Sequence, residues 1–109
     1  MSLAFRVCEA ELEGKTLHCG VLELENAVLA LFWEGAEPKL GSTTATLPGM
    51  ASSQLLGDRD QFLGRMLGTH ISAKSGKMSL VSTHLSQGYS EAVGKTLLDL
   101  TRRVMEEKS

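Results

Sequence analysis

The chain of 109 residues has little cysteine. Cys8 and Cys19 are too few for the disulfide framework of a small secreted protein, so we expect both to be thiols in a reducing compartment. No apolar run approaches the ~18 residues of a membrane span, and residues 1–7 lack the apolar core of a signal peptide. These absences predict an intracellular, cytoplasmic protein that does not bind a membrane.

Positive charge is also scarce. The chain carries 11 Lys and Arg against 13 Asp and Glu, has a formal net charge of −2, and scatters its basic residues along the sequence. Nucleic-acid binding, which needs a basic patch, is therefore disfavoured. A chain this short predicts a single domain over residues 1–109, with one site or surface.

Strand-like segments dominate what is present. A two-residue Glu-Gly turn joins the first two segments and predicts that Cys8 lies opposite Cys19 and Phe5 opposite Leu22. The apolar face changes along this hairpin, so either a bulge switches faces or both faces are partly buried. We predict strands over residues 3–12, 15–24, 27–33, 42–47 and 77–85.

Two helices are predicted. The first follows an Asp-Arg-Asp-Gln sequence at 58–61, typical of a capping box, and runs to about residue 74 before Gly76. Gly64 and Gly68 indicate close packing of this helix, because each costs about 1 kcal/mol relative to alanine in a helix interior. Its expected buried stripe is Phe62, Leu63, Met66, Leu67, Ile71 and Ala73.

The second helix is predicted over residues 90–106, with Val93, Leu97, Leu100 and Val104 as its buried stripe. The resulting order is β-β-β-β-α-β-α. This order predicts an α+β fold in which an antiparallel sheet, a β-meander, carries both helices on one face.

Residues 27–33 are apolar without interruption, and a strand of this kind presents apolar side chains to both faces of its sheet. Two helices suffice for only one face. The other face is therefore predicted to bind a partner protein, although Trp33 could equally lie at an ordinary core edge. The predicted partner-binding residues are Leu22, Leu29, Leu31 and Trp33.

Two patterns that could bind a ligand are incomplete. Gly94-Lys95-Thr96 matches the end of a phosphate-binding loop, but the glycine required at position 89 is Tyr89. Cys8 and Cys19 could approach His18 as zinc ligands, yet His18 and Cys19 are adjacent and face opposite sides of a strand, and no fourth ligand is evident. We predict no metal and no cofactor.

A catalytic triad is disfavoured as well. His70, His84 and the carboxylates of Asp58, Asp60 and Asp99 are candidate members, but no strained elbow positions a serine nucleophile. We predict no catalytic residues.

Three segments carry a resemblance to a known family: Leu-Phe-Trp-Glu-Gly-Ala-Glu-Pro-Lys-Leu at 31–40, Leu-Leu-Gly-Asp at 55–58, and Val-Ser-Thr-His-Leu at 81–85. From residue 27 onward the chain resembles the proteasome assembly chaperone 4 family. The resemblance implies a heterodimer with a proteasome assembly chaperone 3-like protein that assists α-ring formation of the core proteasome. It implies no catalysis, and a location in the cytoplasm and also the nucleus.

Related chaperones dock a C-terminal hydrophobic-Tyr-x tail into the α-ring, whereas this chain ends Met-Glu-Glu-Lys-Ser. Contact with proteasome α-type subunits is therefore expected through a folded surface. Two alternatives remain open: a roadblock- or longin-like trafficking scaffold, and a small phosphate-binding enzyme that uses Lys95. Whether the chain forms a homodimer in isolation is also open.

Overall fold

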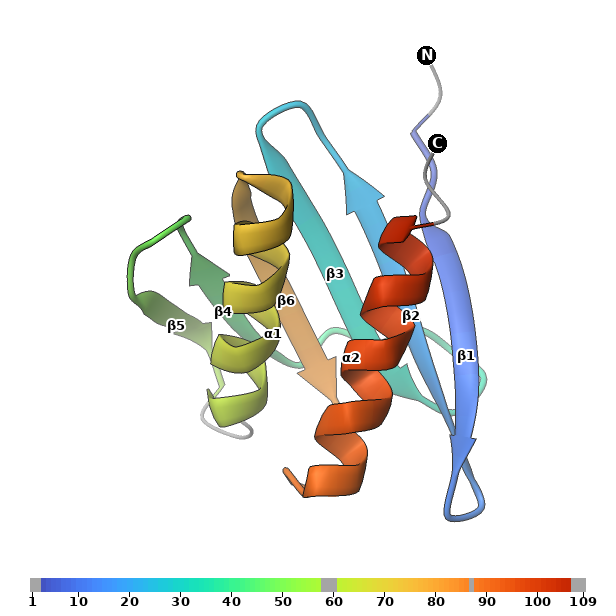
Figure 1. Cartoon of the computed structure of the whole chain (residues 1–109). Coiled ribbons are helices and arrows are strands. Elements are labelled where there is room, and N and C mark those ends of the chain that lie inside the picture. The colour runs from blue at the N-terminus through green and yellow to red at the C-terminus, as the bar shows by residue number, and fades with distance from the viewer. Residues whose placement is uncertain (1–2, 58–60, 87, 107–109) are drawn as a thin grey trace.

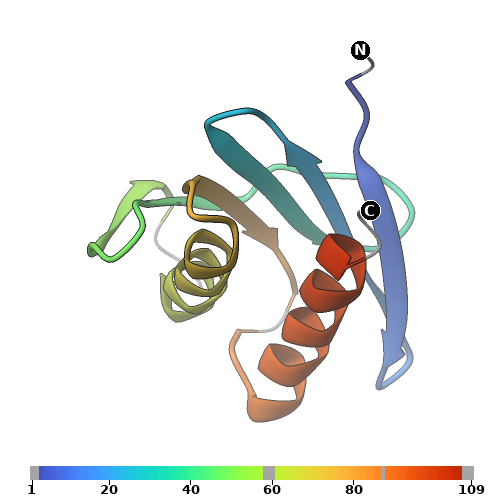
Figure 2. The ribbon, with the colours of Figure 1, turned by 45° about the horizontal axis from the view of Figure 1, so that its top comes forward.

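The computed structural model describes residues 3–57, 61–86 and 88–106. They form a six-stranded sheet with two helices packed on one of its faces (Figures 1 and 2). The elements are β1 (Arg6–Leu12), β2 (Lys15–Glu23), β3 (Ala27–Glu34), β4 (Ser42–Thr46), β5 (Ser52–Leu56), α1 (Gln61–Ser75), β6 (Met78–His84) and α2 (Glu91–Glu106). The predicted α+β fold with both helices on one face is confirmed.

The strand order is β1-β2-β3-β6-β4-β5. The meander is restricted to β1, β2 and β3, because β6 inserts between β3 and β4 and pairs in parallel with β3. The sheet is thus mixed, although every other pairing is antiparallel. The strand β5, where we expected a loop, is held by polar side chains, since Thr44 donates to Gln54 and Thr46 hydrogen-bonds Ser52.

The first hairpin has the predicted register. Glu13 and Gly14 both have positive φ, 53° and 80°, as a type I′ turn requires, and Cys8 lies opposite Cys19. The ladder runs from Arg6 to the turn without a register shift. The change of apolar face therefore comes from partial burial of both faces and not from a bulge.

The core lies between the sheet and the helices. Val28, Ala30 and Phe32 of β3 point to this side and are fully buried. The helix α2 packs over β1 and β2, and α1 packs mainly over β4 and β6 (Figure 1). The predicted stripe of α2 is confirmed, because all four of its residues are buried: Val93, Leu97, Leu100 and Val104.

The helix α1 is rotated relative to the prediction. Leu63, Leu67 and Ile71 are buried as expected and Met66 is partly buried, but Phe62 and Ala73 are exposed, so their placement in the stripe was wrong. Its innermost line consists of small residues. A Cβ atom at Gly64 would overlap Thr44 Oγ1, and one at Gly68 would overlap Thr46 Oγ1. The two glycines therefore let the helix backbone approach the sheet closely, as predicted.

The helix termini follow local sequence signals. Gly76 has a φ of 72° and its N–H donates to the Ser72 carbonyl, which ends α1 as predicted. Ser90 Oγ accepts from the Val93 N–H at the start of α2. The predicted cap at Asp58 lies outside the described residues. Within the described ranges, neither helix is long and apolar enough to cross a membrane.

Candidate interaction surface

The sheet face opposite the helices brings the four predicted partner-binding residues together. Because side chains alternate along a strand, Leu22, Leu29, Leu31 and Trp33 all point away from the buried Val28, Ala30 and Phe32. Neighbouring strands contribute further apolar residues to this side. The open face is defined here as Phe5, Val7, Leu22, Leu29, Leu31, Trp33 and Leu80.

Leucines form a row across the middle of the open face. Leu22 pairs with Leu29, and Leu29 pairs with Leu80, so three adjacent strands present the same side chain at one level. All three are partly exposed. Leu80 was not among the predicted residues, because the sequence does not indicate that β6 lies beside β3. Cross-strand contacts of this kind stabilise the sheet and still leave apolar area accessible to a partner.

Trp33 lies largely beneath the surface of the open face, with 5% of its area exposed. Its indole stacks on the His18 ring, with centroids 5.1 Å apart, and crosses the backbone of Gly20. A Cβ atom at Gly20 would lie 3.3 Å from the Trp33 ring and 3.5 Å from Phe5, so the glycine leaves room for both. A partner would therefore meet Phe5 and the leucines more than the tryptophan.

Phe5 and Val7 extend the open face toward β1, with 42% and 54% of their areas exposed. The hairpin register could have placed both residues beside Gly20 and Leu22 from sequence. At the far end of β3, the connection 35–41 limits the face, because the Gly41 N–H donates to Ser82 Oγ at 2.8 Å. The open face is thus a continuous apolar surface bounded by a loop.

The cysteines belong to the other side of the sheet. Cys8 and Cys19 both face the helices, whereas His18 faces the opposite way. Cys8 Sγ donates to the Leu100 carbonyl at 3.4 Å. The pKa of Cys19 is raised, mainly by a hydrogen bond with Cys8 and to a smaller extent by burial. This thiol therefore stays protonated. Over the described ranges, no three His, Cys, Asp or Glu side chains are grouped to hold a metal.

Lys95 is exposed within α2, one turn after the helix begins. The Gly94 N–H donates to the Ser90 carbonyl at 2.9 Å, so this amide is used by the helix and cannot bind a phosphate. A Cβ atom at Gly94 would lie 2.7 Å from the Tyr89 ring. Tyr89 packs so closely on α2 at this position that a larger residue than glycine would not fit.

The two candidate triad histidines lie on opposite sides of the sheet. His84 ends β6 on the side of the open face, whereas His70 lies on α1 in the helix layer. The pKa of His70 is lowered, mainly by burial and to a smaller extent by the positive charges of Arg102 and Lys74. Asp99 pairs with Arg102 at 3.1 Å. The remaining candidates, Asp58 and Asp60, lie outside the described residues.

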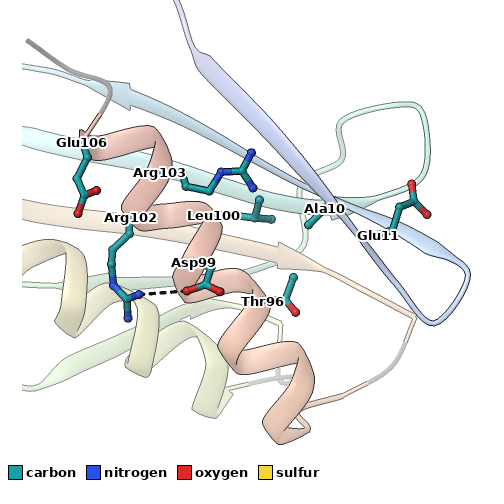
Figure 3. Close-up of a pocket in the computed structure, with 8 residues that line it drawn as sticks. All are labelled: Ala10, Glu11, Thr96, Asp99, Leu100, Arg102, Arg103 and Glu106. Carbon is teal, nitrogen blue, oxygen red and sulfur yellow. Dashed lines mark hydrogen bonds and ion pairs between the residues drawn. The ribbon is translucent and has the colours of Figure 1, made fainter.

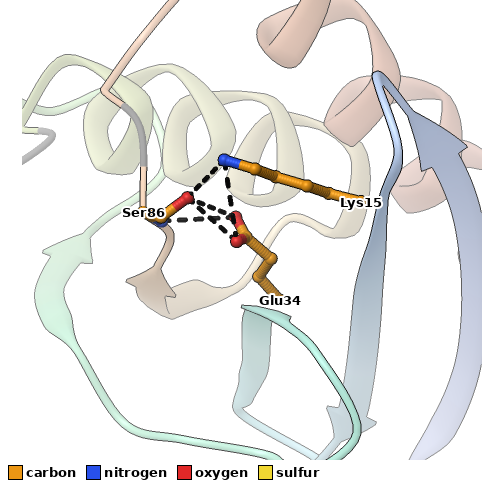
Figure 4. Close-up of polar contacts among 3 residues, drawn as sticks. All are labelled: Lys15, Glu34 and Ser86. Atoms are coloured by element: carbon orange, nitrogen blue, oxygen red, sulfur yellow. Dashed lines mark hydrogen bonds and ion pairs between the residues drawn. The ribbon is translucent and has the colours of Figure 1, made fainter.

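A polar cluster at one end of the sheet was not predicted from the sequence (Figure 4). Ser86 Oγ accepts from Lys15 Nζ at 2.7 Å and donates to Glu34 Oε2 at 2.9 Å, and its N–H donates to Glu34 Oε1 at 3.2 Å. Burial alone would raise the pKa of Glu34, but these hydrogen bonds and the nearby lysines lower it.

Lys15 Nζ also lies 3.9 Å from Glu34 Oε2, within ion-pair distance. The cluster therefore ties β2, β3 and the segment after β6 together.

The fold and the open face define a small α+β protein whose sheet is covered by helices on one side only. The chain matches no known family profile, and no curated protein shows significant sequence similarity to it.

Proposed function

We propose that this chain is an assembly chaperone of the core proteasome that pairs with a proteasome assembly chaperone 3-like protein and assists α-ring formation. The observation that carries this proposal is the open face, an apolar sheet surface that no helix covers in the part of the chain that the structure describes (Figure 2). A surface of this kind is a solubility liability unless another protein covers it.

The dimensions of the molecule support pairing through this face. The described residues span 36 × 29 × 21 Å, so one sheet face has room for the roughly 800 Å² per partner that a specific complex buries. The leucine row gives this face an apolar centre. Toward β1 this face becomes polar, where Glu9 and His18 form a 3.5 Å contact. An apolar centre with a polar rim is typical of protein interfaces.

Two of the three segments that carry the family resemblance include a glycine at the point where a strand ends. Gly35 has a φ of 91° where the chain leaves β3, and Gly57 has a φ of 73° where it leaves β5. Both conformations favour glycine. The proposal places the protein in the cytoplasm and nucleus, with α-type subunits contacted through a folded surface and with no cofactor or catalysis.

Sedimentation velocity on the chain mixed with a purified chaperone 3-like protein tests the proposal. We expect a heterodimer at micromolar concentration, and we expect Leu31→Glu to abolish it, because the complex would bury an unpaired charge. The control is Thr69→Glu, which adds the same charge on the outer side of α1. Thermal unfolding by circular dichroism must show that both variants are folded.

A wild-type chain that remains monomeric in this mixture would contradict the proposal. Pull-down from cell extract with mass spectrometry then identifies the next partner. We expect proteasome α-type subunits. GTPase-regulating complexes in their place would favour the trafficking scaffold, and nucleotide binding that Lys95→Ala abolishes would favour the enzyme.

A further inference from the structure

The strand β1 is one edge of the sheet, and within the described ranges it pairs only with β2. The type I′ turn makes Leu12 and Lys15 a hydrogen-bonded pair, and such pairs alternate along an antiparallel ladder. The backbone N–H and C=O groups of Val7, Glu9 and Glu11 therefore point outward from the edge. Each of these residues offers one donor and one acceptor to an added strand.

A groove runs beside this edge, between β1 and α2 (Figure 3). Ala10 and Leu100 line it, and Arg103 extends from α2 toward β1. Arg102 turns instead to Asp99, with which it pairs at 3.1 Å. Arg103 has no ion-pair partner in the described part of the chain. An extended segment beside β1 would thus place alternate side chains over a groove that holds an available guanidinium.

We propose that the β1 edge binds an extended segment of another protein as an additional antiparallel strand, with Lys or Arg at alternate positions facing Glu9 and Glu11. In such β-addition the backbone hydrogen bonds provide affinity and the alternate side chains provide specificity. The Glu9 side chain is 63% exposed and Glu11 is also exposed, and Glu11 also lines the groove at its β1 side. The intervening residues of the added strand would face Ala10 and Arg103.

The same carboxylates argue against a second copy of this chain as the occupant. Two-fold antiparallel pairing of β1 with itself brings Glu9 and Glu11 next to the glutamates of the other copy, and like charges across a sheet destabilise the pair. The opposite edge is less suited to strand addition. The strand β5 is shorter, and its ladder with β4 is interrupted by a register shift at Thr43 and Thr44.

The probe is a blocked peptide, acetyl-Lys-Thr-Lys-Thr-Lys-Thr-Lys-amide, titrated into the full chain and followed by amide chemical shifts. We expect the shifts to centre on Val7, Glu9 and Glu11. Methylating the lysine amides of the peptide should abolish binding, because those N–H groups pair with β1. Methylating the threonine amides, which point away from β1, should leave binding unchanged.

Charge preference is tested with a double variant, Glu9→Lys with Glu11→Lys. It should weaken binding of the lysine peptide by about tenfold or more and favour a peptide with glutamate in place of lysine. The matched control, Glu25→Lys with Glu91→Lys, makes the same change of net charge at exposed positions in the β2–β3 turn and at the start of α2, and should bind the lysine peptide as the wild type does. Melting curves establish that both variants fold.

Three results would overturn the inference: no shifts along β1, equal binding of the lysine-methylated peptide, or equal binding of a peptide with the same composition in a Lys block followed by a Thr block. Neither the peptide nor the variants involve the leucine row. Failure here is therefore separate from failure of the chaperone proposal.

Discussion

The two faces of this sheet are built by the same strands and differ in what covers them. Along β3, Val28, Ala30 and Phe32 are fully buried under the helices, whereas Leu29 and Leu31 stay partly exposed on the open face. Both sets are apolar. The difference shows that the burial of these side chains depends on whether helices cover their face. The strand β3 is apolar on both faces, as in a sheet covered on both sides, but the described helices cover only one of them.

Stability and association are therefore expected to reside on opposite faces. The covered face removes its side chains from water during folding, and this burial is the main favourable term in folding. The open face keeps part of its apolar area, which a partner could remove from water in a second step. Changes to adjacent residues of one strand can separate these two contributions.

The largest expected effect comes from truncating the covered face. Phe32→Ala should destabilise the fold by about 3–5 kcal/mol, because it removes a fully buried aromatic ring and leaves a cavity. Leu31→Ala, one residue away, should cost less than half as much, since its side chain is already in contact with solvent. Urea denaturation of both variants measures the difference. Equal losses would mean that the open face is part of the core in the free protein.

A second change tests how closely α1 sits on the covered face. Gly68→Ala should destabilise the fold by about 1–3 kcal/mol despite the better helix propensity of alanine, because the new Cβ meets Thr46 Oγ1. The same substitution in a Thr46→Ala background should cost less, since the obstructing oxygen is gone. A double-mutant cycle in urea measures this coupling. Purely additive effects would contradict a close contact at this position.

Elements specified by local signals were predictable from sequence. The two-residue turn set the hairpin register, and α2 carries a stripe at helical spacing that is buried in full. The apolar strand at 27–33 needs cover on both faces of its sheet, and two predicted helices can cover only one. This comparison also indicated that one face would remain open. Each of these inferences rests on neighbours in sequence or on a simple surface argument.

Elements that depend on distant pairing were missed. The position of β6 between β3 and β4 depends on tertiary contacts, so Leu80 could not be assigned to the open face. The strand β5 carries serine and glutamine where an apolar alternation would identify a strand. The rotation of α1 follows from Gly64 and Gly68, which give no hydrophobic signal.

The smallest expected effect lies at the end of the sheet, where Glu34 joins β3 to β2 and to the segment after β6. Its lowered pKa means that the folded chain holds the carboxylate better than the unfolded chain does. The associated stability is therefore present above the ordinary pKa of 4.5 and is lost as the pH falls through the lower folded value.

Ser86→Ala removes the hydroxyl that donates to Glu34 and should move the pKa of Glu34 back toward 4.5, as measured by NMR titration of its carboxyl carbon. The backbone N–H of residue 86 still donates, so the return should be partial. Glu37→Gln, a change at an exposed loop carboxylate, is the control and should leave the Glu34 titration in place. An unchanged Glu34 pKa in Ser86→Ala would assign the lowering to the backbone N–H of residue 86 and to the lysine charges. Raising the salt concentration should then weaken the part that comes from the lysines, because exposed charges are screened.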